Sequence, residues 1–385
     1  MSILNDSPES EIRIVYPETH PGAAETRISF HAGAPDAAAL YAPGSDGTRR
    51  RCFVTDATVA TIPALERFIG AFDDGVCGGD ILIILGSGEP YKTIDSVLTI
   101  IQTAIEAGFS RTDLFVGIGG GVICDLTGFA ASLFKRGAPV HFVPTTLLAM
   151  VDASIGGKTG CDFNSYKNMI GAFYPAQEIS IFPEFLQTLS DDQFRSGLAE
   201  ALKTALLYDK ELFGLFKDGA EKIKRRDPQT LFTIIQKCAQ AKAAVVEQDF
   251  MEKGARMFLN FGHSFGHALE TVAGLGAIAH GDAVAWGMGR ALALCAKKEF
   301  CTERYKDEVF SVLKEYGWNT DAIPQSVIGG GIAERLLAVM HKDKKNQNSK
   351  IRLVLQRGIN DTFTQEMEDA DILAVLKPSA RPSGI

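Results

Sequence analysis

The chain has 385 residues, more than one hydrophobic core usually serves, so we expect two domains in an enzyme-sized protein. Hydrophobic residues make up 46% of the sequence and charged residues 22%, which excludes a mainly disordered chain. The formal net charge of −8 argues against nucleic-acid binding through a general positive field. An anionic ligand would therefore need a local basic pocket.

The ends and the cysteines indicate the compartment. The first residues, Met1 to Asp6, have neither the basic region nor the apolar core of a signal peptide. The longest uncharged apolar stretch, between Arg136 and Asp152, is too short to span a membrane and contains prolines. The 7 cysteines form no Cys-x-x-Cys pair, which favours reduced thiols. We therefore expect a cytoplasmic protein without a membrane segment.

In chain order, apolar runs typical of buried strands alternate with helical stretches through the first half. Strands are predicted at residues 51–55, 80–85, 113–117 and 140–143, and helices at 93–108 and 122–134. This alternation is typical of βαβ units and predicts a Rossmann-like, mostly parallel sheet. The first residues, up to about 25, and the last ones, about 10, are expected to be surface extensions.

The second half has a different periodicity. From about Leu186 onward, apolar residues recur at helical spacing, for example at 231–246 and 283–298. We place a boundary near Pro183, which predicts an α/β domain over residues 1–184 and a mainly α-helical domain over residues 185–385.

A glycine-rich turn, Gly117-Ile118-Gly119-Gly120-Gly121, joins a predicted strand to a predicted helix. Backbone N–H groups at such a helix start can hold a phosphate, so a dinucleotide is a natural ligand. The G-x-G-x-x-G pattern fails because Val122 stands at its last glycine, and a merely tight turn explains the residues equally well. A second turn, Gly86 to Glu89, also follows a strand, and the two together favour a ligand site.

Three histidines suggest a metal site. His263 and His267 stand four residues apart, on one face if helical, and His280 and Glu200 could add further ligands. Ser264 stands where a zinc metalloprotease needs glutamate, which argues against that class. A single histidine is more often structural, but three between positions 263 and 280, of 7 in the chain, favour a site.

The basic residues fall into groups with different interpretations. Lys158 ends a P-loop-like run, but Asp152 occupies the position of its first glycine, which argues against an NTPase. The run from Lys222 to Arg226 predicts a solvated helix face. Other cations lie amid glycines and apolar residues, where burial is costly unless an anion meets them. These are Arg136, Lys158, Lys167, Lys203, Lys242 and Arg256.

Ordered motifs extend from about Ile12 to about Gly358. They are Gly119-Gly120-Gly121-Val122, Asp125-Leu126-Thr127-Gly128-Phe129-Ala130, Val143-Pro144-Thr145-Thr146-Leu147-Leu148-Ala149, Gly156-Gly157-Lys158-Thr159-Gly160, Lys167-Asn168, Gly197-Leu198-Ala199-Glu200, Leu259-Asn260, Gly262-His263, Gly266-His267, His280-Gly281 and Asp343-Lys344-Lys345. In these motifs and their spacing the sequence resembles the 3-dehydroquinate synthases, a family of the sugar phosphate cyclase superfamily.

The resemblance implies a set of site residues. Glu200, His263 and His280 would hold a divalent metal, Zn²⁺ or Co²⁺, and His267 would be a hydrogen-bonding or proton-handling neighbour. The residues implied for the substrate's hydroxyls and carboxylate are Asp152, Lys203, Lys242, Arg256 and Asn260. Those implied for its phosphate are Lys158, Asn168, one of Lys344 and Lys345, and Arg136 reaching across a homodimer. Those implied for NAD⁺ are Asp56, Glu89, Lys92, Gly120, Gly121, Asp125, Thr145, Thr146, Lys167 and Thr188.

The implied activity is that of a carbon–oxygen lyase of the shikimate pathway, which acts on a sugar phosphate through transient oxidation by NAD⁺. Departures from the family pattern are Cys124, Cys161-Asp162, Tyr166, Thr204-Ala205 and Asp282. Because of these departures, a sister sugar phosphate cyclase with another substrate stays an alternative interpretation. A metal-dependent NAD(P) polyol dehydrogenase would share the architecture but release NADH, and an inactive scaffold would not need the intact ligand set.

Overall fold

The computed structural model describes residues 11–17, 22–33, 49–72, 76–163, 166–274, 276–327, 329–342 and 350–377. It contains two compact units, each built from two segments. The first unit is Met1–Phe194 with Pro228–Met251, and the second is Arg195–Asp227 with Glu252–Ile385. The domain boundary at residues 184 and 185 stays a prediction. Across the described ranges, no helix combines the length and the apolar character that a membrane span requires.

Within the described residues, the first unit has an eight-stranded sheet of order β1-β2-β10-β7-β6-β3-β5-β4. Its strands are β1 (Glu11–Val15), β2 (Glu25–Phe30), β3 (Arg51–Asp56), β4 (Val76–Cys77), β5 (Asp80–Leu85), β6 (Leu114–Gly119), β7 (Val140–Pro144) and β10 (Glu178–Ile181). The five inner pairings are parallel and the two edge pairings antiparallel. The predicted mostly parallel sheet is confirmed.

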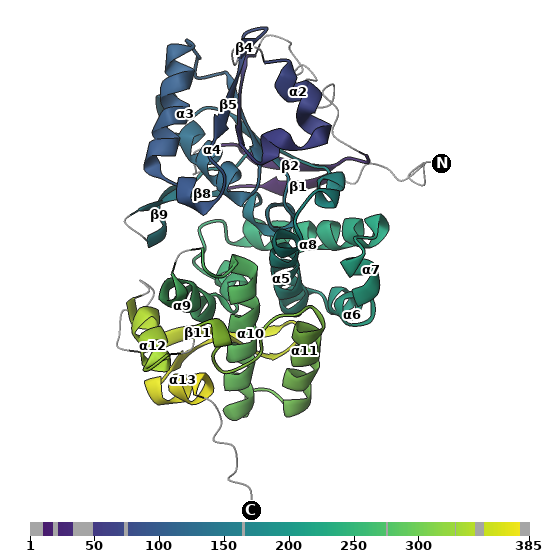
Figure 1. Ribbon diagram of the computed structural model, residues 1–385, viewed down its shortest axis with the longest axis vertical. Coiled ribbons are helices and arrows are strands. Elements are labelled where there is room, and N and C mark those ends of the chain that lie inside the picture. Colours follow the sequence, from purple (N-terminus) through teal and green to yellow (C-terminus); the bar gives the residue numbers. More distant parts are fainter. Residues whose placement is uncertain are drawn as a thin grey trace, which may run out of the picture. The chain divides into compact units, whose positions relative to one another are not determined.

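Helices pack on this sheet where the apolar spacing predicted them. Helix α3 (Ile94–Glu106) begins where the Thr93 hydroxyl accepts a hydrogen bond from the Ser96 N–H at 3.2 Å, a side-chain N-cap. Helix α4 (Gly121–Leu133) begins after the glycine-rich turn, and Figure 1 shows α3 and α4 beside the sheet. The unit also contains α2 (Glu66–Gly70), α8 (Pro228–Gln248) and the hairpin of β8 (Lys158–Phe163) and β9 (Tyr166–Phe173).

The expectation that the first residues form a surface extension is wrong for residues 11–17. Strand β1 pairs with β2, and β2 pairs in parallel with β10, so this segment completes the sheet. Ile14 is fully buried because alternate residues of β1 face the core. Residues 1–10 and 378–385 lie outside the described residues.

The second unit is mainly helical, as predicted. Its helices are α5 (Asp191–Tyr208, which starts in the first unit), α6 (Lys210–Asp218), α7 (Ala220–Lys224), α9 (His263–Ala273), α10 (His280–Lys297), α11 (Glu303–Glu315), α12 (Ile332–Lys342) and α13 (Asp369–Leu376). An antiparallel hairpin, β11 (Ile351–Gly358) with β12 (Asp361–Met367), lies among them and was not predicted. Figure 1 shows α10 running alongside this hairpin.

Candidate functional site

Three helices of the second unit bring Glu200, His263 and His280 together. Glu200 comes from α5, and the histidines are the first residues of α9 and α10. The Nε2 atoms of His263 and His280 lie 3.6 and 3.4 Å from Oε1 of Glu200. One ligand atom from each residue falls within 4.8 Å of the others, although the sequence separates Glu200 from His280 by eighty residues.

This donor set fits a divalent metal. Glu200 is 1% exposed, and its Oε1 is buried without a hydrogen bond. A buried carboxylate oxygen is costly unless a donor or a cation meets it. One carboxylate and two imidazoles are a typical protein ligand set for zinc, and three protein ligands leave a coordination position for substrate.

Lys203 holds the other oxygen of the same carboxylate. Its Nζ lies 2.5 Å from Oε2 of Glu200, one turn along α5, and the two side chains are 2% and 1% exposed. The lysine thus neutralises Glu200 from one side, and Oε1 is left to face the imidazoles.

Glycines allow the two histidine-bearing helices to meet backbone to backbone. A Cβ atom at Gly287 would lie 2.0 Å from the carbonyl oxygen of Gly262, and one at Gly266 would lie 2.9 Å from that of Ala283. Gly262, with φ of +82°, also turns the chain into α9 immediately before His263. The close packing of α9 on α10 therefore fixes the backbone positions of His263 and His280, which carry the two imidazoles.

The start of α10 is also tied to α5. Arg195 donates two hydrogen bonds to the Asp282 carboxylate, at 3.0 and 2.8 Å, and the Gly281 N–H donates to the Ser196 hydroxyl at 3.0 Å. Asp282, one of the departures from the family pattern, thus anchors the helix that carries His280.

His267 lies beside the predicted ligands. Its ring centroid is 5.3 Å from that of His263 and 6.0 Å from that of His280. A second possible ligand group contains His267, Glu270 and His280. No such group in the described part of the chain contains both His263 and His267, so their four-residue spacing puts them on one helix face but not in one ligand set.

The pKa of His280 is strongly perturbed. Burial disfavours its imidazolium form, but the carboxylates of Glu200 and Glu270 outweigh burial and raise the pKa of His280 to about 9. Sequence reasoning missed Glu270. Its spacing was the available signal, because it lies seven residues after His263 and hence on the same helix face.

In the first unit, residues predicted for NAD⁺ cluster at the carboxyl ends of the strands. Oδ1 of Asp56, at the end of β3, accepts hydrogen bonds from the N–H groups of Thr58 and Val59 and from the Ser87 hydroxyl, at 2.9, 3.0 and 2.9 Å. It thereby joins the turns after β3 and β5, including the predicted turn at 86–89. This edge is where open α/β sheets bind ligands.

The glycine-rich turn is tightly packed. A Cβ atom at Gly120 would lie 3.1 Å from Cγ2 of Thr146, and one at Gly121 would lie 3.0 Å from Cβ of Ala153. The neighbouring Thr145 is buried, and its N–H donates to the Gly119 carbonyl at 2.9 Å. The turn thus needs small residues and places the start of α4 at the ligand-binding edge of the sheet.

Charged residues of the same unit form a network around Lys92. Its Nζ lies 2.6 Å from Oδ2 of Asp125 and donates to Oδ1 of Asn168, also at 2.6 Å. Burial raises the pKa of Asp125, against the opposing effect of Lys92. Lys167 pairs with Glu89 at 3.3 Å. Asn168, predicted for phosphate, therefore contacts Lys92, which is predicted for NAD⁺.

Asp152 and Lys242 form a partly buried ion pair in this unit. The Nζ of Lys242, on α8, donates to the Asp152 carboxylate and, at 2.5 Å, to its carbonyl oxygen. Asp152 lies in a π-helical turn, Ala149–Ala153. A sequence separation of ninety residues hides this contact from any local pattern.

The remaining predicted residues are dispersed. Arg256 is 1% exposed, and the Asn260 side chain donates to Glu252, a carboxylate that sequence reasoning missed, at 2.6 Å. Thr188 donates to the Phe185 carbonyl at 3.0 Å. Lys158 is exposed at the start of β8. Lys344 and Lys345 lie outside the described residues.

Arg136 has an unusual backbone. It has φ of +66° and follows Lys135 with φ of +47°, a region that few residues other than glycine adopt. The two residues lie in a 3₁₀ turn, Phe134–Arg136, directly after α4, and both are exposed.

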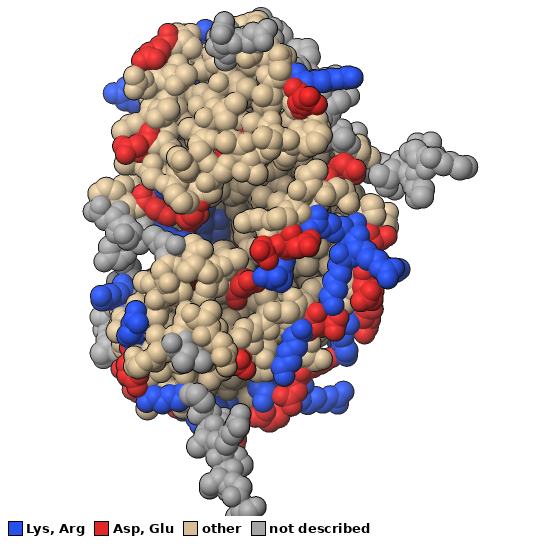
Figure 2. All heavy atoms as spheres, in the orientation of Figure 1, with Lys and Arg blue, Asp and Glu red and all other residues tan. Residues whose placement is uncertain are grey.

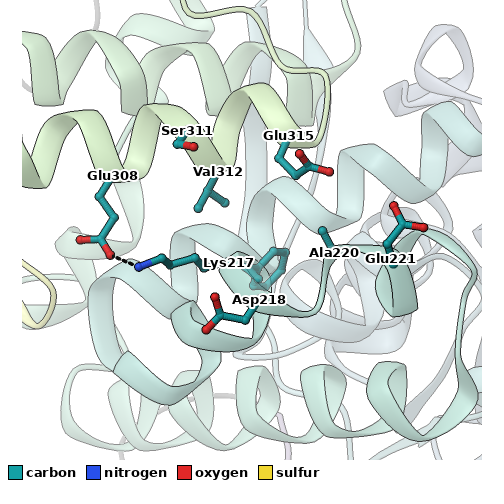
Figure 3. A pocket seen from close by; sticks show the side chains of 9 residues that line it. Lys217, Asp218, Ala220, Glu221, Glu308, Ser311, Val312 and Glu315 are labelled. Carbon is teal, nitrogen blue, oxygen red and sulfur yellow. Dashed lines mark hydrogen bonds and ion pairs between the residues drawn. The ribbon is translucent and has the colours of Figure 1, made fainter.

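A surface groove of the second unit contains no predicted site residue. The groove lies between helices α6, α7 and α11 and has a volume of about 440 Å³. Its charged lining includes Lys217 and Glu308, which pair at 2.7 Å (Figure 3). Over these helices, acidic and basic side chains are interleaved on the surface (Figure 2). Lys224 and Arg225 pair with Glu315 and Glu221, which agrees with the solvated face predicted for 222–226.

Comparison with known proteins finds relatives along most of the chain. Residues 82–196 match the family model "3-dehydroquinate synthase N-terminal", and residues 197–346 match "3-dehydroquinate synthase C-terminal". A 3-dehydroquinate synthase of Pelobacter propionicus is 40% identical over 294 residues, which cover 76% of this chain and 80% of that protein.

Solved structures agree in fold. The 2-epi-5-epi-valiolone synthase ValA of Streptomyces hygroscopicus, with NAD⁺ and Zn²⁺ bound, is 29% identical with a TM-score of 0.78, over 90% of this chain and 95% of that one. A 2-deoxy-scyllo-inosose synthase complexed with carbaglucose-6-phosphate, NAD⁺ and Co²⁺ is 22% identical with a TM-score of 0.81, over 95% and 99%.

Proposed function

The chain belongs to the 3-dehydroquinate synthase family and has its lyase activity in the shikimate pathway, and we propose that the residue clusters described above carry that activity out. The reaction converts 3-deoxy-D-arabino-heptulosonate 7-phosphate to 3-dehydroquinate and phosphate. One observation carries the assignment of the site. His263 and His280 lie close to Oε1 of Glu200, a buried carboxylate oxygen without a hydrogen bond.

The chemistry explains why a redox cofactor and a metal are needed. Phosphate leaves an unactivated carbon only if the neighbouring C–H is acidic, and a ketone at C5 makes it so. When bound, NAD⁺ would accept a hydride from C5 and later return it, and the divalent metal would supply Lewis acidity toward the C5 oxygen, whose hydroxyl loses a proton as the ketone forms. After phosphate departure and re-reduction, the ring opens and an intramolecular aldol step closes the carbocycle.

Glu200 Oε1 and the Nε2 atoms of His263 and His280 would hold Zn²⁺ or Co²⁺. Lys203, bound to Oε2, keeps the carboxylate in a single orientation. His267 is near both imidazoles but outside the proposed ligand set, a position suited to holding or moving a proton of the substrate.

For NAD⁺, we assign the pyrophosphate to the backbone at Gly120 and Gly121, because a helix start offers N–H groups to an anion. The other proposed contacts are Asp56, Glu89, Lys92, Asp125, Thr145, Thr146, Lys167 and Thr188. The hydrogen bonds of Asp56 and the ion pairs of Lys92 and Lys167 support this by holding those side chains in place.

For the substrate, we assign its hydroxyls and carboxylate to Asp152, Lys203, Lys242, Arg256 and Asn260. Lys158, Asn168 and one of Lys344 and Lys345 would bind the phosphate. The partly buried Asp152–Lys242 pair supports the assignment, because it fixes a cation and an anion that can orient hydroxyl groups.

We also propose that the protein is a homodimer in which Arg136 reaches the substrate phosphate bound in the neighbouring subunit. Its left-handed backbone supports a special role, since strained residues persist where the surrounding structure needs them. A cytoplasmic location is also proposed. It is compatible with six cysteines that are free and buried, namely Cys52, Cys124, Cys161, Cys238, Cys295 and Cys301.

The test supplies a catalytic amount of NAD⁺ with excess heptulosonate phosphate and measures phosphate and NADH together. One phosphate per substrate without accumulating NADH is expected, because the hydride returns within each turnover. Conversion of the added NAD⁺ to NADH, with the reaction stopping when that NAD⁺ is used up, would instead indicate the polyol dehydrogenase. Turnover only of another sugar phosphate would indicate a sister cyclase.

A further inference from the structure

We propose that Glu270 is a positioning residue of the metal site, whose carboxylate holds the Nδ1–H of His280 and so directs Nε2 of that imidazole toward the metal. This inference rests on the proposed metal site of Glu200, His263 and His280. It adds a side chain that neither the motifs nor the comparisons assign.

The ring of His280 lies between two carboxylates. Its Nδ1 is 3.3 Å from Oε2 of Glu270, and its Nε2 is 3.4 Å from Oε1 of Glu200. A neutral imidazole carries one proton, and a carboxylate acceptor at Nδ1 keeps the proton there. The lone pair of Nε2 then points to the side where Glu200 and His263 present their own ligand atoms.

Glu270 is built into the core of the unit. It is 4% exposed, and burying a carboxylate is costly unless donors compensate it. It lies on α9 two turns after His263. One face of this helix therefore carries both His263, a proposed metal ligand, and Glu270, the hydrogen-bond acceptor for His280. The close glycine packing of α9 on α10 brings that acceptor within reach of His280.

His263 shows the same arrangement with a different acceptor. Its Nδ1 lies 3.3 Å from the carbonyl oxygen of Phe261. Both imidazoles therefore have an oxygen acceptor at Nδ1 and present Nε2 to Glu200. The acceptor at Nδ1 of His280 is a carboxylate, which increases the basicity of the ring more than a carbonyl does. A substitution of the Glu270 side chain can therefore change the donor strength of His280.

The experiment compares wild type, Glu270→Gln and Glu270→Ala. Zn²⁺ affinity is measured by competition with a chelator, and the visible absorption of Co²⁺ reports the ligand field. Thr271→Ala is the matched control, because Thr271 is the next residue, is exposed, and donates to a carbonyl of its own helix.

We expect Glu270→Ala to bind one Zn²⁺ with an affinity about 10- to 100-fold lower and to shift the Co²⁺ spectrum. Glu270→Gln keeps an oxygen acceptor and the side-chain shape, so it should lose less affinity. Thr271→Ala should match wild type. If Glu270→Ala does not fold, Glu270→Gln still decides, because a purely structural role predicts wild-type affinity and an unshifted Co²⁺ spectrum for it.

Wild-type affinity and spectrum in both Glu270 variants would overturn the inference and leave the metal site standing. Loss of stoichiometric metal from Glu270→Gln, with metal retained in His263→Ala, would also overturn it, since the metal would then lie in the group of His267, Glu270 and His280. Absence of metal binding by wild type would refute the metal site itself.

Discussion

The ammonium of Lys203 lies 2.5 Å from one oxygen of Glu200, while the other oxygen faces His263 and His280. The two oxygens of one buried carboxylate thus have different partners. Oε2 pairs with Lys203, and Oε1 lies at the proposed metal position. Without the lysine, the negative charge of Glu200 would be compensated by a bound metal or, in the metal-free protein, by the imidazolium of His280, whose pKa is raised to about 9.

Lys203→Met should therefore make stability depend on metal. Removing the lysine leaves the buried carboxylate facing the imidazolium of His280 without its second cationic partner, so we expect the metal-free variant to lose up to about 3–5 kcal/mol of unfolding free energy. Zn²⁺ should restore part of this loss. Urea unfolding with and without Zn²⁺ measures both effects.

Lys217→Met is the control for this variant. Lys217 pairs with Glu308 at 2.7 Å on the surface, where water screens the charges, so little change is expected (Figure 3). Equal effects of the two substitutions would contradict the role of the Lys203–Glu200 pair.

His267→Ala should retain the metal and lose catalytic rate. His267 neighbours both proposed histidine ligands but shares no ligand group with His263 among the described residues. A proton-transfer role predicts a fall in kcat of about 10²–10⁴-fold and a changed pH profile. Wild-type kcat with unchanged metal content would show that the ring is not needed for proton transfer.

The stability of the first unit should fall in mild acid because of His141 on β7. Burial, with smaller contributions from Arg49 and Arg27, lowers the pKa of His141 against the opposing effect of Glu178. Below about pH 6.5 the unfolded chain binds a proton that the folded chain does not, so unfolding becomes easier. The urea midpoint should drop between about pH 7.5 and 5.5, and His141→Gln should drop less. Identical pH dependence in the two proteins would contradict this assignment.

Shared sites predict complementation between inactive variants. Arg136→Ala and Lys158→Ala should each be nearly inactive as homodimers. After co-refolding in equal amounts, half of the dimers are mixed and each has one intact site, so activity should approach roughly a quarter of wild type. An active Arg136→Ala homodimer would remove the shared-site proposal and leave the lyase activity intact.

Local periodicity predicted the parts of the fold in which one face of an element is buried. Strands β3, β5, β6 and β7 and helices α3 and α8 fall where apolar spacing placed them. The β11–β12 hairpin was missed although Ile351, Leu353 and Leu355 alternate in the sequence and are buried, because they follow a long helical region.

The candidate site shows the limit of such patterns. Spacing paired His263 with His267, whereas the family resemblance selected Glu200 and His280, which only tertiary packing brings near His263. Glu252 was missed because a lone glutamate carries no signal until its partner is known. Glu270 was missed because its helical spacing from His263 indicates a shared site only once His263 is known to belong to one. The Asp152–Lys242 contact likewise depends on how α8 packs in the first unit.

Metal content of dialysed protein tests the proposed site most directly. Wild type should retain about one Zn²⁺ or Co²⁺ per chain through Glu200, His263 and His280. His263→Ala should lose both the bound metal and the release of phosphate from the heptulosonate phosphate, because two protein ligands hold a metal poorly. Full metal content in His263→Ala would contradict the assignment of this ligand set.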